Sequence, residues 1–215
     1  MMNRFTKPCI RTSALVTIDT QQDTLDGQPF EVPGTSAILP RMRKLLDVYR
    51  LRSMPIVHIV RIYKMDGSNV DLCRKEAFSK GEKPFLEGGP GCAPAQALFD
   101  QQVTLNSDLL LSGKPQRVDD HEIILYKPRW GAFYDTGLDT YLKKCGVDSL
   151  AFTGCNFPNC PRASIYEASE RDYKIVLVKD AISGLDEQGV QEMKCIGVEI
   201  ADSKTLIRAV DVLGV

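Results

Sequence analysis

The sequence predicts an α/β fold in three layers (αβα), with helices on both faces of a mostly parallel sheet of about six strands. Mostly apolar runs, typical of strands buried on both faces of a parallel sheet, alternate about six times with helical patterns. Several runs end directly at a charged residue, where open α/β sheets place their ligands. No repeat, low-complexity tract or linker interrupts residues 1–215, so we expect a single domain.

The expected strands are short and mostly apolar. They are SALVTI at 13–18, PIVHIVRI at 55–62, EIILY at 122–126, LAFT at 150–153, IVLV at 175–178 and GVEI at 197–200. His58 lies inside the second run, where a hydrogen-bonded core histidine is more common than a ligand. We expect His121, just before the third run, to be an exposed loop residue.

The intervening segments have apolar residues at helical spacing. Residues 35–51 are the best example, because Ile38, Met42, Leu45 and Tyr49 recur on one face and Pro40 falls in the first turn. Further helices are expected at 136–145, 161–172, 188–196 and 203–213. Residues 105–112 fit either a short helix or a strand.

Residues 63–118 form the least regular stretch of the chain. They include SKGEKPFLEGGPGCAPAQ at 79–96, which is rich in Gly and Pro. Long irregular segments in compact domains are commonly lids or binding loops. We therefore expect an excursion at 63–118 that tunes the substrate or forms a contact between subunits.

Bulk properties exclude several classes of partner. The net charge is −1 with both signs interspersed, so no basic patch indicates nucleic acid, and no apolar run is long enough to span a membrane. The seven cysteines are scattered and odd in number, and the first residues show no secretory pattern. We expect reduced thiols, a cytoplasmic location and a small-molecule substrate.

Cys160 stands at a position that favours reactivity. Pro161 follows it, and proline is favoured at the first position of a helix. We therefore expect Cys160 to be the N-cap of a helix, where the positive end of the helix dipole favours the thiolate, which is the nucleophile. The alternative, equally open from this position alone, is a buried cysteine that acts as a small hydrophobe.

Asp19, Lys127 and Cys160 each follow an expected parallel strand. If those strands are neighbours, the three side chains meet in one crevice, where a carboxylate accepts the thiol proton and an ammonium stabilises the charges. Taken singly, Asp19 is also compatible with a turn aspartate and Lys127 with an exposed lysine.

Three segments resemble the isochorismatase-like cysteine hydrolases, which have a Rossmann-like fold. They are ALVTIDTQQD, KPRWGAFYDTGLDTYL and TGCNFPNCPRASIYEASERDYKIVLVKDAISG. Their order and spacing run in register from about residue 13 to residue 210. The resemblance implies that Asp19 is the proton acceptor, Lys127 the catalytic lysine and Cys160 the nucleophile.

The resemblance also implies the surroundings of the nucleophile. It implies a cis peptide between Cys155 and Asn156 and an oxyanion hole formed by the N–H groups of Asn156 and Cys160. Substrate contacts are implied for Gln21 and, as pocket walls, for Trp130, Phe133 and Tyr134, although these three aromatic residues are equally compatible with core packing. Homo-oligomers, as dimers or tetramers, are also implied.

Two departures from the family pattern bear on function. Phe157 replaces the usual threonine and Pro161 a frequent valine, which indicates a subfamily with its own substrate. The metal-binding nicotinamidase branch carries an Asp-x-His cluster after the second strand, and this chain lacks it, so we expect no metal and no cofactor.

The sequence thus predicts an amidohydrolase that cleaves the C–N bond of a small amide, ureido or carbamoyl compound through a thioester. The alternatives are a non-catalytic binding or regulatory member of the family and a thiol redox sensor that pairs Cys160 with Cys155.

Overall fold

A seven-stranded sheet organises the computed structural model, which describes residues 3–214. The strand order is β3-β4-β2-β1-β5-β6-β7, and every pair is parallel except β3 with β4. The strands are β1 (Ser13–Ile18), β2 (Ile56–Val60), β3 (Gln116–Asp119), β4 (Glu122–Tyr126), β5 (Ser149–Gly154), β6 (Lys174–Ile182) and β7 (Glu199–Ala201). Met1, Met2 and Val215, which the expected domain includes, lie outside the described residues.

The three-layer fold is confirmed, but the sheet has one strand more than expected. The additional strand, β3, reads QRVD, and three of its four residues are exposed. It forms an antiparallel edge hairpin with β4, so its formation depends on pairing rather than on a buried apolar run. An apolar pattern cannot indicate such a strand.

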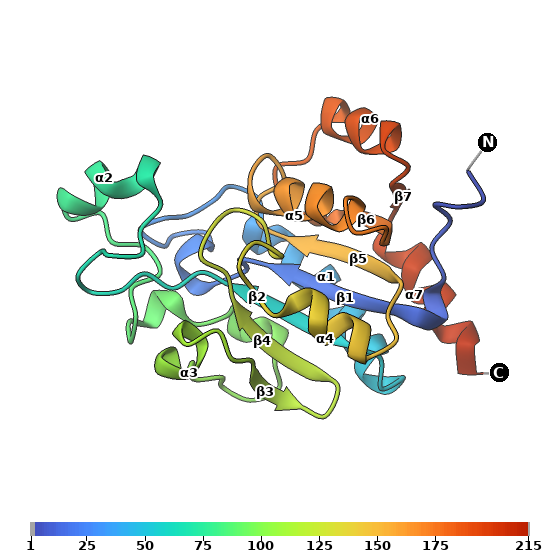
Figure 1. The fold of residues 1–215 in the computed structure, drawn as a ribbon, viewed down its shortest axis with the longest axis horizontal. Coiled ribbons are helices and arrows are strands. Elements are labelled where there is room, and N and C mark those ends of the chain that lie inside the picture. The colour runs from blue at the N-terminus through green and yellow to red at the C-terminus, as the bar shows by residue number, and fades with distance from the viewer. Residues whose placement is uncertain (1–2, 215) are drawn as a thin grey trace.

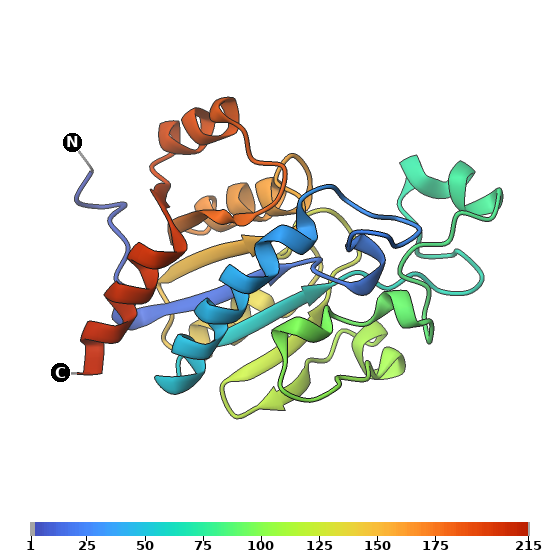
Figure 2. The ribbon, with the colours of Figure 1, turned by 180° about the vertical axis from the view of Figure 1, so that it is seen from behind.

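Helices cover both faces of the sheet. Helices α1 (Thr35–Leu51) and α7 (Ser203–Asp211) lie on the face turned toward the viewer in Figure 2. Helices α4 (Leu138–Lys144), α5 (Cys160–Ser169) and α6 (Glu187–Cys195) lie on the face shown in Figure 1. The two short helices are α2 (Lys75–Ser79) and α3 (Ser107–Leu111), so residues 105–112 contain a helix.

The alternation of side chains along β1 builds the two halves of the core. Val16 and Ile18 pack in the cluster formed with α4, α5 and α6. Leu15 points to the opposite face and packs with α1 and α7. β1 is buried along its whole length because it has a strand on each side and helices on each face.

The part of the excursion around α2 projects beyond the carboxyl ends of the parallel strands, whereas its last residues enter β3 at the edge of the sheet (Figure 1). It is anchored to the loop after β1 by Asp23, whose Oδ2 accepts a hydrogen bond from the Phe85 N–H at 2.6 Å. Gly91 packs against the same carboxylate, where an added Cβ would lie 1.8 Å from Asp23 Oδ1. These contacts place the excursion directly over the edge of the sheet where β1 ends.

A polar network crosses the sheet nearer its amino edge. His58 is buried, as expected, between Thr17 Oγ1 and Glu122 Oε1, each 2.8 Å from a ring nitrogen. Arg50 donates two hydrogen bonds to the Glu122 carboxylate, at 2.7 and 2.8 Å. Burial raises the pKa of Glu122, but the hydrogen bonds from Arg50 and His58 outweigh burial and lower it to about 2.

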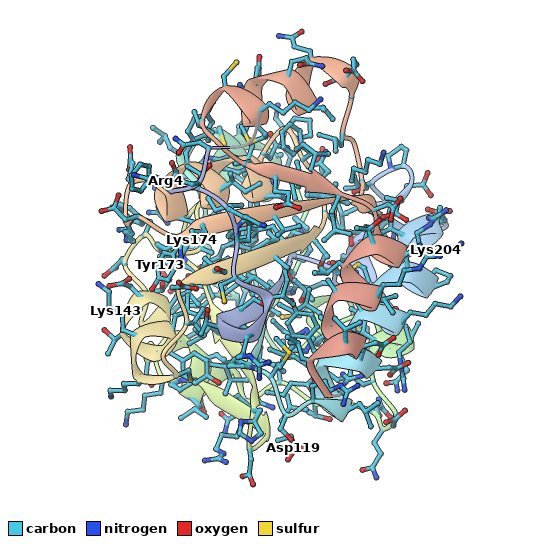
Figure 3. All side chains as sticks on the ribbon, turned by 90° about the vertical axis from the view of Figure 1, so that its right-hand side faces the viewer. Arg4, Asp119, Lys143, Tyr173, Lys174 and Lys204 are labelled. Atoms are coloured by element: carbon cyan, nitrogen blue, oxygen red, sulfur yellow. The ribbon has the colours of Figure 1, made fainter. Side chains whose placement is uncertain are left out.

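The amino edge itself is a polar surface. Figure 3 looks onto it, with Asp119 at the end of β3 and Lys174 at the start of β6 among its labelled side chains. His121, in the turn between β3 and β4, is exposed, as predicted. Within residues 3–214, no helix combines the length and the apolarity that crossing a bilayer requires.

The Glu122 network makes a prediction about stability. Glu122→Gln leaves Arg50 without its buried partner, and we expect it to lower the free energy of unfolding at pH 7 by about 3 kcal/mol. A carboxylate with a lowered pKa stabilises the fold above its ordinary pKa of 4.5 and loses this contribution as the pH falls toward 2. The difference between wild type and variant should therefore shrink over that range in urea unfolding.

The matched control is Glu76→Gln, which removes a glutamate whose side chain is 81% exposed in a pair with Lys80. We expect this substitution to cost less than about 1 kcal/mol. Equal effects of the two substitutions at pH 7 would contradict the role given to Glu122.

Candidate active site

Asp19 and Lys127 form a buried ion pair at the carboxyl edge of the sheet. Lys127 Nζ lies 2.8 Å from Asp19 Oδ2. The lysine is fully buried, and the aspartate side chain is 9% exposed. Asp19 follows the central strand β1, whereas Lys127 follows β4, which is separated from β1 by β2. The long lysine side chain therefore reaches across the end of β2 to meet the carboxylate.

The two oxygens of Asp19 are in different environments. Oδ2 accepts the ion pair from Lys127, which also donates to the Arg129 carbonyl at 3.1 Å. Oδ1 is buried and has no hydrogen-bond partner among the described residues. A buried carboxylate oxygen without a partner is costly, so it is available to accept a proton from a nearby donor.

Cys160 lies close to this pair, as the effects on its pKa show. Its side chain is 5% exposed, and it is the first residue of α5, with Asn159 rather than Cys160 as the N-cap. Burial, followed by the negative charge of Asp19, raises the pKa of the Cys160 thiol to about 11 against the opposing charges of Lys127 and Arg61. Burial and the charge of Asp19 therefore act against the thiolate that the expected position at a helix end favours.

The turn that carries Cys160 differs from the expectation at one bond. No described peptide bond is cis, so the implied cis bond between Cys155 and Asn156 is absent. The chain instead reverses at Gly154, whose φ is 115° and where an added Cβ would lie 2.2 Å from the Ile18 carbonyl oxygen. A glycine adopts this backbone at little cost.

The backbone N–H groups of the turn that leads into α5 differ in their hydrogen bonding. The Cys155 N–H donates to the Ile18 carbonyl at 2.8 Å, which joins the turn to β1. The N–H groups of Asn156 and Cys160 make no hydrogen bond within residues 3–214. Two unpaired N–H groups beside a cysteine suit an oxyanion, and this remains their expected role.

The helix that carries Cys160 also holds the loop that follows Lys127. Ser164 Oγ donates to the Cys160 carbonyl at 2.7 Å and accepts from the Ala132 N–H at 3.0 Å. One turn later, Glu167 Oε2 accepts from the Phe133 N–H at 2.8 Å. These bonds tie the lysine loop to the nucleophile helix, so the two cannot move apart independently.

Of the four expected substrate contacts, Trp130 is the one that lies among site residues, with the guanidinium carbons of Arg61 and Arg74 at 5.9 and 4.8 Å from its ring. Phe133 packs in the core, with its ring 5.7 Å from that of Tyr173. Tyr134 is 56% exposed.

Gln21 has a structural position in place of the expected substrate contact. It is fully buried, and its amide donates to the carbonyls of Arg61 and Cys92 at 2.8 and 2.6 Å. It also accepts from the Arg61 N–H at 2.8 Å. Gln21 thus joins the ends of β1 and β2 to the excursion and leaves no N–H of its amide for a substrate.

The sequence analysis missed Arg61, the largest fully buried side chain of the described residues. It follows the end of β2, and its guanidinium donates to the carbonyls of Pro128 and Arg129 at 2.8 and 2.6 Å. The expected strand 55–62 included Arg61 in its interior. Applying the strand-end rule used for Asp19 and Lys127 to a strand that ends at Val60 would have found it.

The described residues contain no candidate metal site. Within residues 3–214, no three side chains of His, Cys, Asp or Glu gather in a group able to hold a metal ion. The ring of the unusual Phe157 packs against Gly189 of α6, where an added Cβ would lie 2.3 Å from the ring. The Phe157 N–H donates to the Ser183 carbonyl at 2.7 Å.

A cavity of about 220 Å³ opens between the loop after β1 and the excursion. Its lining residues are Thr24, Phe30, Val32, Tyr63, Arg74, Ala77, Phe78, Glu82, Pro84 and Phe85. Cys160 is not among them. Tyr63 connects the two regions, because its ring lies 5.7 Å from the guanidinium carbon of Arg61.

Comparison with known proteins gives consistent results. A crystal structure of an isochorismatase family protein from Desulfovibrio vulgaris is 30% identical, with a TM-score of 0.78, over 95% of this chain and 99% of that one. A protein of Arabidopsis thaliana named "probable inactive nicotinamidase" is 28% identical over 88% of this chain and 91% of its own. A ureidoacrylate amidohydrolase of Methylobacterium radiotolerans is 25% identical over 79% of this chain and 66% of its own.

The model of the isochorismatase domain matches residues 13–204, a range that begins at β1 and contains Asp19, Lys127 and Cys160. Since this match spans most of the chain, the protein belongs to the isochorismatase family.

Proposed function

We propose that this protein is a cysteine-dependent amidohydrolase, which hydrolyses the C–N bond of a small amide, ureido or carbamoyl compound through a thioester on Cys160. The observation that carries the proposal is that the two carboxylate oxygens of Asp19 have different environments. Lys127 is bound to Oδ2, while Oδ1 is buried without a partner beside the cysteine. Such a carboxylate is held in place by the ammonium and is free to accept the thiol proton.

The first half of the reaction forms the thioester. Because the resting thiol keeps its proton, with a pKa of about 11, attack on the carbonyl carbon is coupled to transfer of that proton to Asp19 Oδ1. The charges of Lys127 and Arg61 favour the anionic sulfur as it forms. The N–H groups of Asn156 and Cys160 are the donors for the oxyanion of the tetrahedral intermediate. Its collapse expels ammonia or an amine, which takes the proton from Asp19.

The second half releases the product. Water gives a proton to Asp19 and attacks the thioester carbon, and the resulting tetrahedral intermediate expels the sulfur of Cys160. The proton on Asp19 returns to the sulfur, which restores the thiol. The product is a carboxylic acid from an amide, or a carbamic acid from a ureido or carbamoyl compound. Asp19 accepts and returns one proton in each half, and no metal is needed for this sequence of steps.

One relative supports the proposed reaction class, and another raises an alternative. The ureidoacrylate amidohydrolase is named for cleavage of a ureido compound. The Arabidopsis relative is named as inactive, which favours a non-catalytic role as the second candidate. An activity measurement distinguishes the two candidates directly.

Cys160→Ala should abolish turnover while the fold survives. We expect wild type to release ammonia from at least one member of a panel of ureido, carbamoyl and simple amide compounds, and the variant to be slower by about a thousandfold or more. Cys195→Ala, which removes an exposed cysteine on α6, should retain wild-type activity. Ammonia release by the Cys160→Ala variant would overturn the thioester mechanism, and a silent wild type would favour the non-catalytic candidate.

Asp19→Asn should separate the two effects of the carboxylate on the thiol. The variant loses the proton acceptor, so we expect turnover to vanish. It also loses the negative charge that raises the pKa of Cys160, so the pKa falls and alkylation of Cys160 by iodoacetamide at pH 8 becomes faster than in wild type.

Peptide mass spectrometry gives the labelling rate of each cysteine, and the exposed Cys145 serves as the internal reference whose rate stays constant. Slower or unchanged labelling of Cys160 in the Asp19→Asn variant would contradict the placement of this carboxylate beside the sulfur.

A further inference from the structure

Arg61 holds a carbonyl group that the ammonium of Lys127 also uses. Its Nη2 donates to the Arg129 carbonyl at 2.6 Å, and Lys127 Nζ donates to the same oxygen at 3.1 Å. Nη1 donates to the neighbouring Pro128 carbonyl at 2.8 Å. The two prongs of one planar guanidinium therefore hold two successive peptide groups directly after Lys127.

A buried carboxylate orients this guanidinium. Arg61 Nη1 lies 3.1 Å from Asp71 Oδ2, and the two side chains are 1% and 3% exposed. Asp71 also accepts a hydrogen bond from the Tyr63 hydroxyl, and its Oδ2 lies 3.5 Å from Arg74 Nη1. A carboxylate that is itself held from several sides restricts the guanidinium to one orientation.

The backbone of Arg61 is held by the loop that carries Asp19. Gln21, two residues after Asp19, accepts from the Arg61 N–H and donates to the Arg61 carbonyl, each at 2.8 Å. These contacts and the ion pair close a ring whose members, in order, are Asp19, Gln21, Arg61, Arg129 and Lys127. Arg61 thus joins the loop after β1 to the loop after β4 without using the side chain of Asp19.

Arg50 provides a comparison, because it too is an arginine paired with a buried carboxylate. Its side chain is 22% exposed and bound to Glu122, and it donates to the Leu98 carbonyl at 2.9 Å. Glu122 is the first residue of β4, whereas Lys127 follows the last one. Arg50 therefore contributes to the fold at the opposite end of β4, while Arg61 shares an acceptor with Lys127.

Arg61 is too deeply buried to bind a substrate directly. Its side chain is 1% exposed, and both Nη atoms donate to protein acceptors. Burial and Asp19 raise the pKa of the Cys160 thiol, and the charges of Lys127 and Arg61 oppose this rise. Arg61 can therefore act on the reaction through the position of Lys127 or through its own charge, and experiment separates the two.

We propose that Arg61 is a positioning residue of the hydrolase, which holds the Arg129 carbonyl where it aligns the Lys127 ammonium with Asp19. This inference rests on the proposed hydrolase function and adds a residue to its machinery. A lysine at position 61 keeps the positive charge but lacks the planar fork that holds two carbonyls and a carboxylate together. Arg61→Lys therefore separates position from charge.

Turnover is measured with the compound of the ureido, carbamoyl and amide panel that wild type hydrolyses fastest. Arg61→Lys should lower kcat by roughly 10- to 100-fold, because a small displacement of a catalytic group has an effect of this order. KM should change by less than about threefold, because Arg61 does not bind the substrate. The matched control, Arg50→Lys, breaks the other fork and should leave both constants within about twofold of wild type. An unchanged kcat, a loss confined to KM, or an equal loss in the control would overturn the inference.

Alkylation of Cys160 by iodoacetamide at pH 8 tests the same inference without a substrate. A displaced ammonium opposes the rise in the thiol pKa less, so Arg61→Lys should slow the labelling by roughly 3- to 10-fold relative to Cys145. In a Lys127→Met background, the same substitution should change the rate by less than about twofold, because no ammonium is left to position. Equal slowing in both backgrounds, or none in either, contradicts the positioning role. Slowing that requires Lys127 supports it even if wild type hydrolyses none of the compounds, in which case the proposed function alone fails.

Asp71→Asn keeps the inference testable if near-ultraviolet circular dichroism shows that Arg61→Lys or Lys127→Met does not fold. Loss of this negative charge by itself favours the thiolate and speeds up the labelling of Cys160. A guanidinium that has lost its orientation instead lets Lys127 move, which slows the labelling. Slower labelling therefore supports the positioning role of Arg61, and unchanged or faster labelling refutes it.

Discussion

The buried ion pair between Lys127 and Asp19 is the interaction on which the rest of the site depends. It joins the ends of two strands that are not neighbours, because β2 lies between β1 and β4. An ammonium with no exposed surface is tolerated only when a carboxylate and further acceptors compensate its lost hydration. Asp19 and the Arg129 carbonyl provide this compensation. The lysine consequently holds the carboxylate in place, and the second carboxylate oxygen has no partner among the described residues.

The environment of the ion pair also raises the pKa of the Cys160 thiol. A permanent thiolate beside Asp19 would place two negative charges in a desolvated region, and the raised pKa of Cys160 reflects that cost. The charges of Lys127 and Arg61 oppose the rise without reversing it. In the proposed reaction, the anionic sulfur therefore forms only as its proton passes to the Asp19 carboxylate. This suits a carboxylate that acts as both acceptor and donor.

The excursion completes the site in a way that the sheet cannot. Asp23 and Gln21 bind it to the loop after β1, through the Phe85 N–H and the Cys92 carbonyl. This anchoring accompanies the contact of Arg74 with Trp130, which is distant in the chain, and with Tyr63, which lies in the same excursion. The ties from Ser164 and Glu167 hold the loop of Trp130 to the nucleophile helix. Hydrogen bonds therefore connect the excursion to the loop after β1, and the loop after Lys127 to α5.

The sequence by itself determined the three-layer fold, six of the seven strands and the residues that stand at the carboxyl ends of β1, β4 and β5. Apolar runs and helical periodicity encode which segments are buried, and the family resemblance carries the three motifs. The apolar pattern of the sequence does not indicate the edge strand β3, because most of its residues are polar and exposed. Its formation depends on pairing with β4.

Only the tertiary structure decided the burial of Cys160, which raises the pKa of its thiol, and the structural position of Gln21. It also decided that Arg61 and Arg74 share Asp71. The physical reason is the same for these polar groups. Strand order and burial determine which charges meet and how much water they lose, and neither quantity is written in the spacing of residues along the chain.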